Sequence, residues 1–565
     1  MTKRLGASKP SSLPASPPAW HMAHGPWLLI VVLTVVAYLP ALDGGFIWDD
    51  NDYVTSNEHL SSAEGLGRIW FEIGATPQYY PLVFTSFWVE YQLWADHPLG
   101  YHVTNVLLHA ASAVVLMVVL RRLAVPGAWL AAAIFALHPI QVESVAWITE
   151  RKNVLSGLLY LGALLAYLGF DRVTAPGTGR PWRWYAVALV LFCGALASKT
   201  VTCSLPAAIV LIAWFKRGRV GGRDLLPLVP FFAIGVVMAL GTVRVETHHV
   251  GTEDVDFGLS VVERCLIGGR ALWFYLGKLC LPVELAFIYP RWAIDATRWW
   301  QYLFPLAAGG LVVGLWLWRK RLGRGPLVAA LFFGGTLLPA LGFIDVYPML
   351  YSYVADHFQY LASIGPIALF SAALIAGLNR LARAGGRTPE PGAIRAPSLA
   401  LAAILIAALG TLTWRQGRVY ENPETLWRDT LTTNPTAVMA AINLADLLLA
   451  DGRAEESTEL LRQATEVNPA VVHRHILARA HFNLGNNLAR EDRVGAALEA
   501  YRRALEVDPT YHNAHLGLGW AYEYQGRLDE AIREYRILLS HIPEHTAGRQ
   551  ALDRALSTKR RLSPE

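Results

Sequence analysis

The sequence predicts an all-α protein, in which a polytopic helical membrane domain is followed by a solenoid of helical repeats. Hydrophobic residues make up 54% of the 565 residues and charged residues 16%, whereas soluble proteins carry about 25% charged residues. Long apolar runs recur from Trp27 to Trp414 and then stop. Residues 419–565 are instead rich in Ala, Leu, Glu and Arg, and prolines recur there at a spacing of 34 residues.

The N-terminal residues 1–26 are rich in Ser and Pro and carry Lys3 and Arg4. This composition predicts a disordered cytoplasmic N-terminus. The apolar run that follows has the length of a signal-peptide core. Because Ala41-Leu42-Asp43 is not a small-x-small cleavage site, we interpret the run as a retained membrane anchor.

Residues 27–418 form the predicted transmembrane domain. Its apolar stretches long enough to cross about 30 Å of hydrocarbon are 27–42, 102–120, 128–147, 153–170, 182–198, 200–215, 225–243, 300–318, 326–344, 353–379 and 398–414. Five connectors carry the cations: Arg121-Arg122, 172–183, 216–223, 319–324 and 380–395. The positive-inside rule places all five in the cytoplasm. The net charge of +5 therefore reflects topology, and no nucleic-acid partner is expected.

The segment 264–282 decides the topology. It carries Arg264, Arg270 and Lys278, which is unusual for a lipid-facing helix, so we interpret it as an external interfacial or re-entrant helix. Eleven spans then satisfy the charge rule, with external loops 43–101 and 244–299 and a repeat domain 419–565 on the external, periplasmic side of the inner (plasma) membrane. The alternative is twelve spans and a cytoplasmic repeat domain. With eleven spans, the unusual polar residues of the apolar half all face the external side.

The C-terminal prolines mark a repeat. Pro435 and Pro469 are 34 residues apart, as are Pro509 and Pro543, while 40 residues separate Pro469 from Pro509. A 34-residue period of helix pairs ending in Pro is typical of tetratricopeptide repeats. The longer interval implies a six-residue insertion near 471–476 or one longer helix. Such repeats stack into a concave surface that binds peptides or proteins, although a passive scaffold is the alternative.

Two adjacent carboxylates, Asp49 and Asp50, follow the first apolar run. Paired carboxylates suit general-base chemistry or cation coordination, whereas many such pairs are solvated loop charges or helix caps. Further along, Pro139 is expected to break the third span near its outer end.

Polar side chains then gather at the expected cavity mouth. Arg151 and Lys152 are suited to a lipid-linked phosphate, with interfacial snorkelling as the alternative. The remaining candidates are His138, Glu143, Tyr80, Tyr353, Asp356 and His357. His138 alone is more often a packing histidine, and Asp356-His357 either caps a helix or lines the site.

These parts, in this order, resemble one family. The Asp-Asp pair after the first span, the His-Pro…Glu…Arg-Lys segment at 138–152, the Tyr…Ala-Asp-His-Phe-Gln-Tyr run at 351–360 and the C-terminal repeats resemble the transmembrane and tetratricopeptide O-mannosyltransferases and their bacterial relatives. That family belongs to the C-type (GT-C) superfamily of membrane glycosyltransferases. The family's late motif usually has Glu-Arg where this chain has Asp356-His357.

The resemblance implies inverting transfer of mannose or a similar hexose from a polyprenyl-phosphate donor to an acceptor hydroxyl, with protein Ser/Thr as the expected acceptor. Asp49 would be the base and Asp50 would orient it, or both would hold a divalent cation (Mg²⁺ or Mn²⁺); no other cofactor is expected. The expected phosphate ligands are Arg151, Lys152, Arg270 and His357, and the expected sugar-lining residues are His138, Glu143, Tyr80, Tyr353 and Asp356. The repeat domain would dock the acceptor protein, and membrane lipids would surround the spans. A transporter of lipid-linked sugars and a non-catalytic assembly scaffold are the alternatives.

Overall fold

The computed structural model describes residues 25–171, 181–248, 257–384 and 396–562, and every regular element in these ranges is a helix. The predicted disorder of residues 1–26 therefore concerns residues that lie, except for the last two, outside the described ranges. The helices of the apolar half are α1 (Gly25–Ala37), α2 (Leu39–Leu42), α3 (Ala63–Phe71), α4 (Pro81–Trp94), α5 (Pro98–Arg122), α6 (Ala128–Leu137), α7 (Val142–Ala146), α8 (Arg151–Asp171), α9 (Trp182–Leu196), α10 (Leu205–Arg217), α11 (Gly222–Leu225), α12 (Val229–His248), α13 (Val261–Cys280), α14 (Leu303–Leu322), α15 (Gly325–Leu337), α16 (Ile364–Ala384) and α17 (Ala396–Val419). The helices of the repeat half are α18 (Pro423–Thr433), α19 (Val438–Ala450), α20 (Ala454–Thr465), α21 (Arg474–Arg490), α22 (Val494–Val507), α23 (Asn513–Tyr524), α24 (Leu528–His541) and α25 (Thr546–Leu562).

Seven helical segments of the described residues are long and apolar enough to cross a membrane, which makes the chain a multi-pass membrane protein. They are Pro98–Arg122, Ile148–Asp171, Thr200–Arg217, Gly222–Val245, Trp299–Leu322, Ile364–Leu381 and Leu399–Val419. An eighth arises if α6 and the segment Pro139–Ala146, bent by 54°, are one broken span. The shorter apolar helices α1, α9 and Gly325–Ala340 coincide with the other predicted ranges. The count of eleven spans and their orientation stay predictions.

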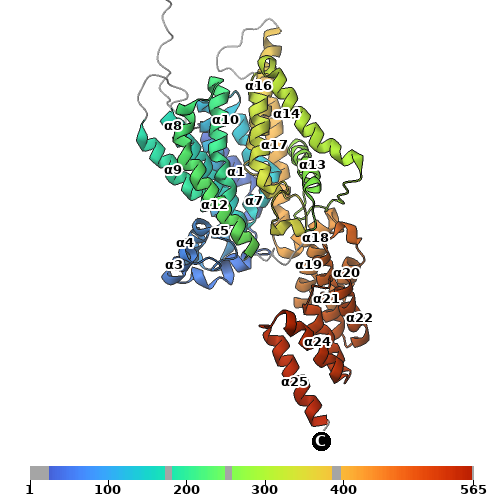
Figure 1. Cartoon of the computed structure of the whole chain (residues 1–565). Helices are drawn as coiled ribbons and strands as arrows, with labels where there is room; N and C mark the ends of the chain where they lie inside the picture. The colour runs from blue at the N-terminus through green and yellow to red at the C-terminus, as the bar shows by residue number, and fades with distance from the viewer. Residues whose placement is uncertain (1–24, 172–180, 249–256, 385–395, 563–565) are drawn as a thin grey trace, which may run out of the picture.

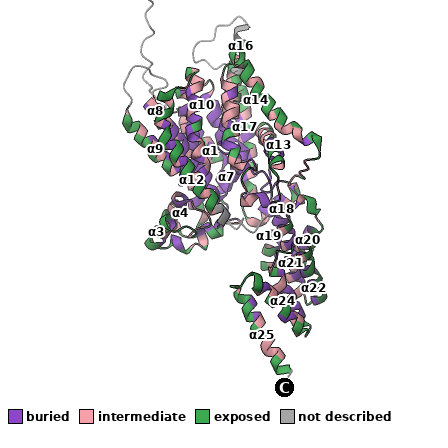
Figure 2. Cartoon of the chain, viewed as in Figure 1, coloured by how far each residue is buried: buried purple, intermediate pink, exposed green. Residues whose placement is uncertain are grey.

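Burial differs between helices as a lipid environment requires. Helix α14 has no buried residue, and its Leu306 and Leu317 side chains are 68% and 66% exposed; its ribbon is pink and green along its length in Figure 2. Every residue of α6 except Trp129 is buried. The buried helix α6 therefore lies in the centre of the bundle. The exposed apolar surface of α14 is stable only against hydrocarbon, so α14 faces lipid.

Two local expectations meet the structure differently. The break at Pro139 is confirmed, because α6 ends at Leu137 and the chain bends there. The predicted start of a span at residue 353 is wrong, since α16 begins at Ile364. Residues 356–359 form a short 3₁₀ turn instead, and the polar Asp356, His357 and Gln359 make a continuous lipid-facing helix unfavourable there.

The external features predicted from the sequence lie at one end of the helix bundle. Figure 1 shows α8, α10, α12, α16 and α17 running roughly side by side and α14 running obliquely away from them, with α3, α4 and the repeat helices α18–α25 toward their lower end. Helix α17 leads into α18 through only residues 420–422. Residues 43–101 and the repeat domain therefore approach the same end of the membrane domain.

The repeat helices pack in pairs, and in two pairs, α21 with α22 and α23 with α24, a Gly makes room for a Tyr ring. A Cβ atom on Gly485 would lie 2.5 Å from the Tyr501 ring, and one on Gly519 would lie 2.3 Å from the Tyr535 ring. Any larger side chain would separate the paired helices. Most of the six extra residues of the 40-residue interval lie in a longer helix, because α21 has 17 residues whereas α19 has 13 and α23 has 12, and the rest lie in the connection before α21.

Candidate active site

Asp50 ties the first loop to the start of α8. Its carboxylate is fully buried and accepts hydrogen bonds from the Ile47 amide (2.9 Å), the Thr149 amide (2.8 Å) and the Thr149 hydroxyl (2.7 Å). Burial and the neighbouring Asp49 carboxylate raise the pKa of Asp50 to about 7. Asp50 thus fixes the loop, and it does not line the cavity next to it.

Asp49 faces that cavity. Its Oδ1 atom is buried without a hydrogen-bond partner among the described residues. Burial raises the pKa of Asp49 to about 6, against the opposing attraction of the Lys152 ammonium. A carboxylate that lines a cavity, has a raised pKa and has one oxygen without a hydrogen bond is suited to accept a proton from a bound substrate.

The orientation of Asp49 is set by its neighbour Trp48. Trp48 has φ of +46°, a backbone conformation that non-glycine residues adopt at a cost of about 1–3 kcal/mol. Its ring stacks on Trp147 at 5.7 Å and meets Phe287, Tyr351 and Trp427 edge-on at 5.1–5.8 Å. These four rings hold the strained residue and so fix the direction in which Asp49 projects.

The cavity beside Asp49, here called the polar cavity, has a volume of about 430 Å³, within the range of about 300–1,000 Å³ typical of small-molecule sites. The residues that line it are Trp48, Asp49, Asp52, Tyr53, Pro77, Gln78, Glu143, Trp147, Glu150, Lys152, Phe287, Ile288, Tyr347, Pro348, Tyr351, Ser352, Val354, Ala355, His357, Met439, Asn443 and Arg479. The last three belong to the repeat domain, and the others come from the membrane domain and its loops.

Two ammonium groups and one imidazole ring surround one buried carboxylate at the edge of this cavity. Glu150 is fully buried. It lies 2.9 Å from the Lys152 Nζ atom, 3.4 Å from the Lys199 Nζ atom and 3.9 Å from the His357 Nε2 atom. Glu150 thus holds the two ammonium groups close together beside the polar cavity, and Lys152, Lys199, His357 and Glu150, here called the cation cluster, offer N–H donors to an anion.

His357 is held rigidly. The Glu143 carboxylate accepts a hydrogen bond from the backbone amide of His357 (2.9 Å) and contacts the Nδ1 atom of the His357 ring at 2.9 Å. The Asn153 amide group donates to the His357 carbonyl (3.0 Å) and to Glu150 (2.6 Å). The Nδ1 contact leaves the Nε2 atom on the side of Glu150, and both His357 and Glu143 line the polar cavity.

A second, more apolar cavity of about 220 Å³ adjoins the polar cavity and is called the flanking cavity here. The two share Gln78, Lys152, Pro348 and His357. The apolar lining of the flanking cavity includes Val201, Val243, Ile344 and Leu361, and Lys199 and Tyr80 also line it. A charged group held by Lys152 and His357 would therefore continue into an apolar space.

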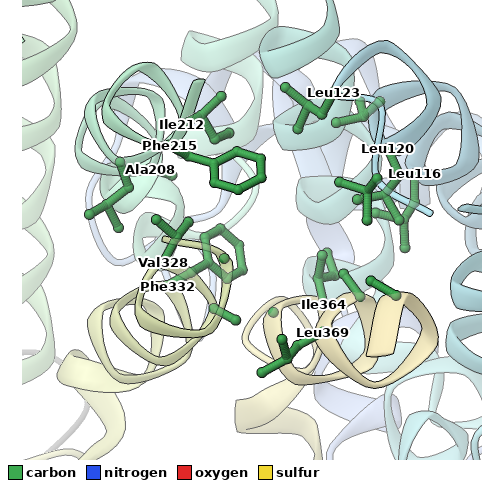
Figure 3. Close-up of a pocket in the computed structure, with 18 of the residues that line it drawn as sticks. Leu116, Leu120, Leu123, Ala208, Ile212, Phe215, Val328, Phe332, Ile364 and Leu369 are labelled. Atoms are coloured by element: carbon green, nitrogen blue, oxygen red, sulfur yellow. The ribbon is translucent and has the colours of Figure 1, made fainter. Parts of the chain in front are cut away.

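A third cavity, of about 200 Å³, lies within the bundle between α5, α8, α10, α15 and α16. Figure 3 shows its Leu, Ile, Val and Phe side chains directed into the space. No charged residue is among its described lining residues, and it shares none of them with the polar cavity. It lacks the groups that a reaction on a sugar or phosphate needs.

Arg151 is placed differently from the sequence expectation. Its side chain is fully buried and bonds to Glu90 (2.7 Å), Ser86 (3.2 Å), the Tyr101 carbonyl (2.9 Å) and Asn105. It does not line the polar or the flanking cavity. Because its donors are engaged by α4 and α5, Arg151 joins these helices to α8 and is not a free phosphate ligand.

Four more of the predicted residues lie outside the lining of both cavities. The Arg270 guanidinium lies over the rings of Trp292 (4.4 Å) and Phe304 (5.8 Å), and His138 contacts the Leu279 carbonyl at 3.0 Å. The Tyr353 ring lies under Arg291 at 4.8 Å. Asp356 accepts a hydrogen bond from the Tyr289 hydroxyl at 3.0 Å. Each has a packing partner that explains it, so the structure does not bring these four into the site.

The divalent cation considered for the Asp pair does not fit. Both oxygens of Asp50 are occupied by amide and hydroxyl donors, and of the two adjacent carboxylates only that of Asp49 lines the cavity. Among the described residues, no group of three or more His, Cys, Asp or Glu side chains is arranged to hold a metal ion. The carboxylates therefore serve separate purposes, one fixing the loop and one facing the cavity.

The structure also adds residues that were not among the predicted site residues. Glu150 and Lys199 belong to the cation cluster, and Asn443 and Arg479 line the polar cavity from the repeat domain. Lys199 had a local signal, since it is a lone cation at the end of an apolar run. Asn443 and Arg479 had none, because nothing in the repeat pattern tells which turn meets the membrane domain.

Comparison with known proteins agrees with this architecture. Tetratricopeptide-repeat family models match residues 436–510 and 482–545. The chain is 24% identical to the mouse protein O-mannosyl-transferase TMTC4 over 86% of its own length and 66% of that protein. It is 25% identical to the Drosophila melanogaster protein O-mannosyl-transferase Tmtc1 over 80% of its own length and 62% of that protein. The chain thus has distant homology to these transferases while spanning less than two thirds of their length. The crystal structure of MamA matches 26% of the chain, and the chain covers 81% of it, at 23% identity with a TM-score of 0.22.

Proposed function

We propose that this protein is an inverting membrane glycosyltransferase that moves a hexose, with mannose as the first candidate, from a polyprenyl-phosphate donor to the hydroxyl of a protein Ser or Thr. One observation carries the proposal. The carboxylate of Asp49, whose Oδ1 atom has no hydrogen-bond partner among the described residues, faces a polar cavity that also holds Lys152 and His357, and these two residues border the apolar flanking cavity. The distant homology to protein O-mannosyl-transferases supports the same reaction class.

The donor would lie across the two cavities. Its phosphate would contact Lys152, Lys199 and His357, which Glu150 and Glu143 hold in position. Its isoprenoid chain would occupy the flanking cavity, and its sugar would lie in the polar cavity. A lipid-linked donor needs this combination, since a charged headgroup and an apolar chain must be bound side by side.

The reaction needs a base and a stabilised leaving group. Asp49 would accept the proton of the acceptor hydroxyl as that oxygen attacks the anomeric carbon. The bond between the anomeric carbon and the phosphate oxygen breaks, and its electron pair leaves with the polyprenyl phosphate. The cation cluster stabilises that charge, so no acid is needed at the leaving group. Attack from the side opposite the phosphate inverts the anomeric configuration.

Transfer by the purified full-length protein tests the proposal. The protein, in lipid nanodiscs, is supplied with polyprenyl-phosphate mannose, or the glucose and galactose equivalents, and with Ser/Thr peptides that are then analysed by mass spectrometry. Transfer that is lost in Asp49→Asn and kept in Asp43→Asn, an exposed residue of the same loop, is the expected result. Absence of transfer from all three donors, or full activity in Asp49→Asn, would refute it.

A further inference from the structure

The repeat domain forms one wall of the polar cavity. Met439 and Asn443 from α19 and Arg479 from α21 line the same space as Asp49. This wall is fixed in place from α18. Trp427 packs edge-on against Trp48 at 5.6 Å, and the Asn434 amide group donates to the Ile288 carbonyl at 3.0 Å. Part of the candidate catalytic cavity is thus built from the repeats.

Two polar groups on this wall have unused hydrogen-bonding capacity. The Asn443 Nδ2 atom is buried and has no hydrogen-bond partner among the described residues. The half-buried Arg479 guanidinium likewise forms no ion pair or hydrogen bond with any residue that the structure describes. Arg479 attracts the Asp446 carboxylate electrostatically, but the two groups do not come within ion-pair distance. A buried donor without a partner is unfavourable, so a ligand that accepts a hydrogen bond from the Asn443 Nδ2 atom and pairs with Arg479 would be bound by both groups.

These groups are placed for the acceptor and not for the donor. Lys152 and His357 border the flanking cavity, whereas Asn443 and Arg479 line only the polar cavity. A lipid-linked donor approaches from the membrane side, and a polypeptide acceptor approaches from the side of the repeats. The Asn amide matches a peptide group, which has one donor and one acceptor, and the Arg guanidinium matches a carboxylate.

We propose that Asn443 and Arg479 form an acceptor subsite for an extended peptide whose target Ser or Thr has an acidic side chain nearby. This inference rests on the proposed transferase function. Asn443 holds a peptide group of the acceptor, and Arg479 pairs with the acidic side chain. The subsite selects which hydroxyls reach Asp49, and neither residue takes part in the chemical step.

Peptide selectivity of the full-length protein tests the subsite. Three short peptides are compared that differ only beside a central Thr, where they carry Asp, Asn or Lys. Fluorescence anisotropy measures peptide binding without donor, and steady-state kinetics give kcat and the KM values for peptide and for polyprenyl-phosphate mannose. In the wild-type protein we expect the Asp peptide to bind about 10-fold or more tightly than the Asn peptide, and the Lys peptide to bind weakest.

The variants separate the two contacts. Arg479→Met should raise the Kd and KM of the Asp peptide about 10- to 100-fold, remove the preference among the three peptides, and leave kcat and the donor KM unchanged. Arg479→Lys should restore part of the preference. Asn443→Leu should weaken the binding of all three peptides to the same extent. Arg490→Met, an exposed residue of the same helix outside the cavity, is the matched control and should change nothing.

Other outcomes overturn the inference. They are a raised donor KM in Arg479→Met, an unchanged peptide preference in that variant, and an absence of peptide binding or acidic preference in the wild-type protein. Hydrolysis of polyprenyl-phosphate mannose by water, compared between wild type and Asp49→Asn, reports on the transferase site without any peptide. Asp49-dependent hydrolysis without acidic-peptide preference refutes the subsite and keeps the proposed function. Absence of both refutes both.

Discussion

Asp49→Asn tests the base with little disturbance of the fold. The amide has nearly the shape of the carboxylate, and the Asp49 Oδ1 atom has no partner whose bond would be broken. We therefore expect the thermal unfolding temperature of the purified protein to stay within a few degrees of wild type. A general base contributes about two to four orders of magnitude in rate, so kcat should fall about 100- to 10,000-fold while the donor KM changes little.

The pH dependence gives an independent readout of the same residue. Burial raises the pKa of Asp49 to about 6, and only the ionised carboxylate accepts a proton. Transfer should therefore rise with pH through about 6, level off above about pH 7 and be lost below about pH 5. The residual activity of Asp49→Asn should lack this rising limb between pH 5 and 7.

Asp50→Asn is the informative comparison. Asp50 accepts three hydrogen bonds through its two oxygens, whereas an Asn side chain offers one oxygen and turns an NH₂ group toward an N–H or O–H donor. We expect a loss of about 1–3 kcal/mol in stability and a smaller loss of kcat than in Asp49→Asn. A well-folded Asp49→Asn protein with turnover within a few-fold of wild type and an unchanged pH profile would refute the assignment of the base.

Three further experiments test the packing of Arg151, the binding of the donor and the topology. Arg151→Met should destabilise the protein by about 3–5 kcal/mol, because Glu90 is left as an uncompensated buried charge; thermal unfolding with Arg68→Met, an exposed ion pair, as control checks this. Lys152→Met should raise the donor KM at least 10-fold, whereas Arg270→Met should leave it unchanged, since Arg270 lines neither cavity. Alkaline phosphatase fused after Glu565 should be active and green fluorescent protein dark at that position, as the positive-inside rule predicts; the reverse pattern would support the twelve-span alternative.

Much of the fold could be predicted because its signals are local. Apolar length predicts where candidate spans lie, and the proline period predicts the repeats, although it leaves open whether the 40-residue interval holds an insertion or the longer helix α21. The start of α16 was predicted eleven residues too early, since residues 353–363 are apolar enough to extend the run but are used to line or support the polar cavity. Hydropathy does not distinguish an apolar side chain facing lipid from one facing a cavity.

The sequence predicts the candidate site only in part, because the role of each side chain depends on which residues, distant in sequence, it contacts. Asp49, Glu143, Lys152 and His357 do line one cavity, as expected for polar residues placed at one end of the spans. Arg151 and Lys152 are adjacent cations with the same sequence signal. The Arg151 side chain pairs with Glu90, whereas the Lys152 side chain lines the cavity. That difference depends on α4 and α5, which are distant in sequence, so no local pattern reports it.

The geometry also explains why the repeats and the membrane domain occur in one chain. Trp48 is held at φ of +46° by four rings, and one of them, Trp427, belongs to the first repeat-domain helix. Only residues 420–422 separate α17 from α18, so α18 cannot swing away without withdrawing a ring from Trp48 and a wall from the cavity. Under the proposed function, an acceptor peptide bound by the repeats would be presented to Asp49 from a fixed surface. Holding acceptor and base in one rigid frame lowers the entropic cost of reaching the reactive geometry, which a repeat domain on a long flexible linker would not do.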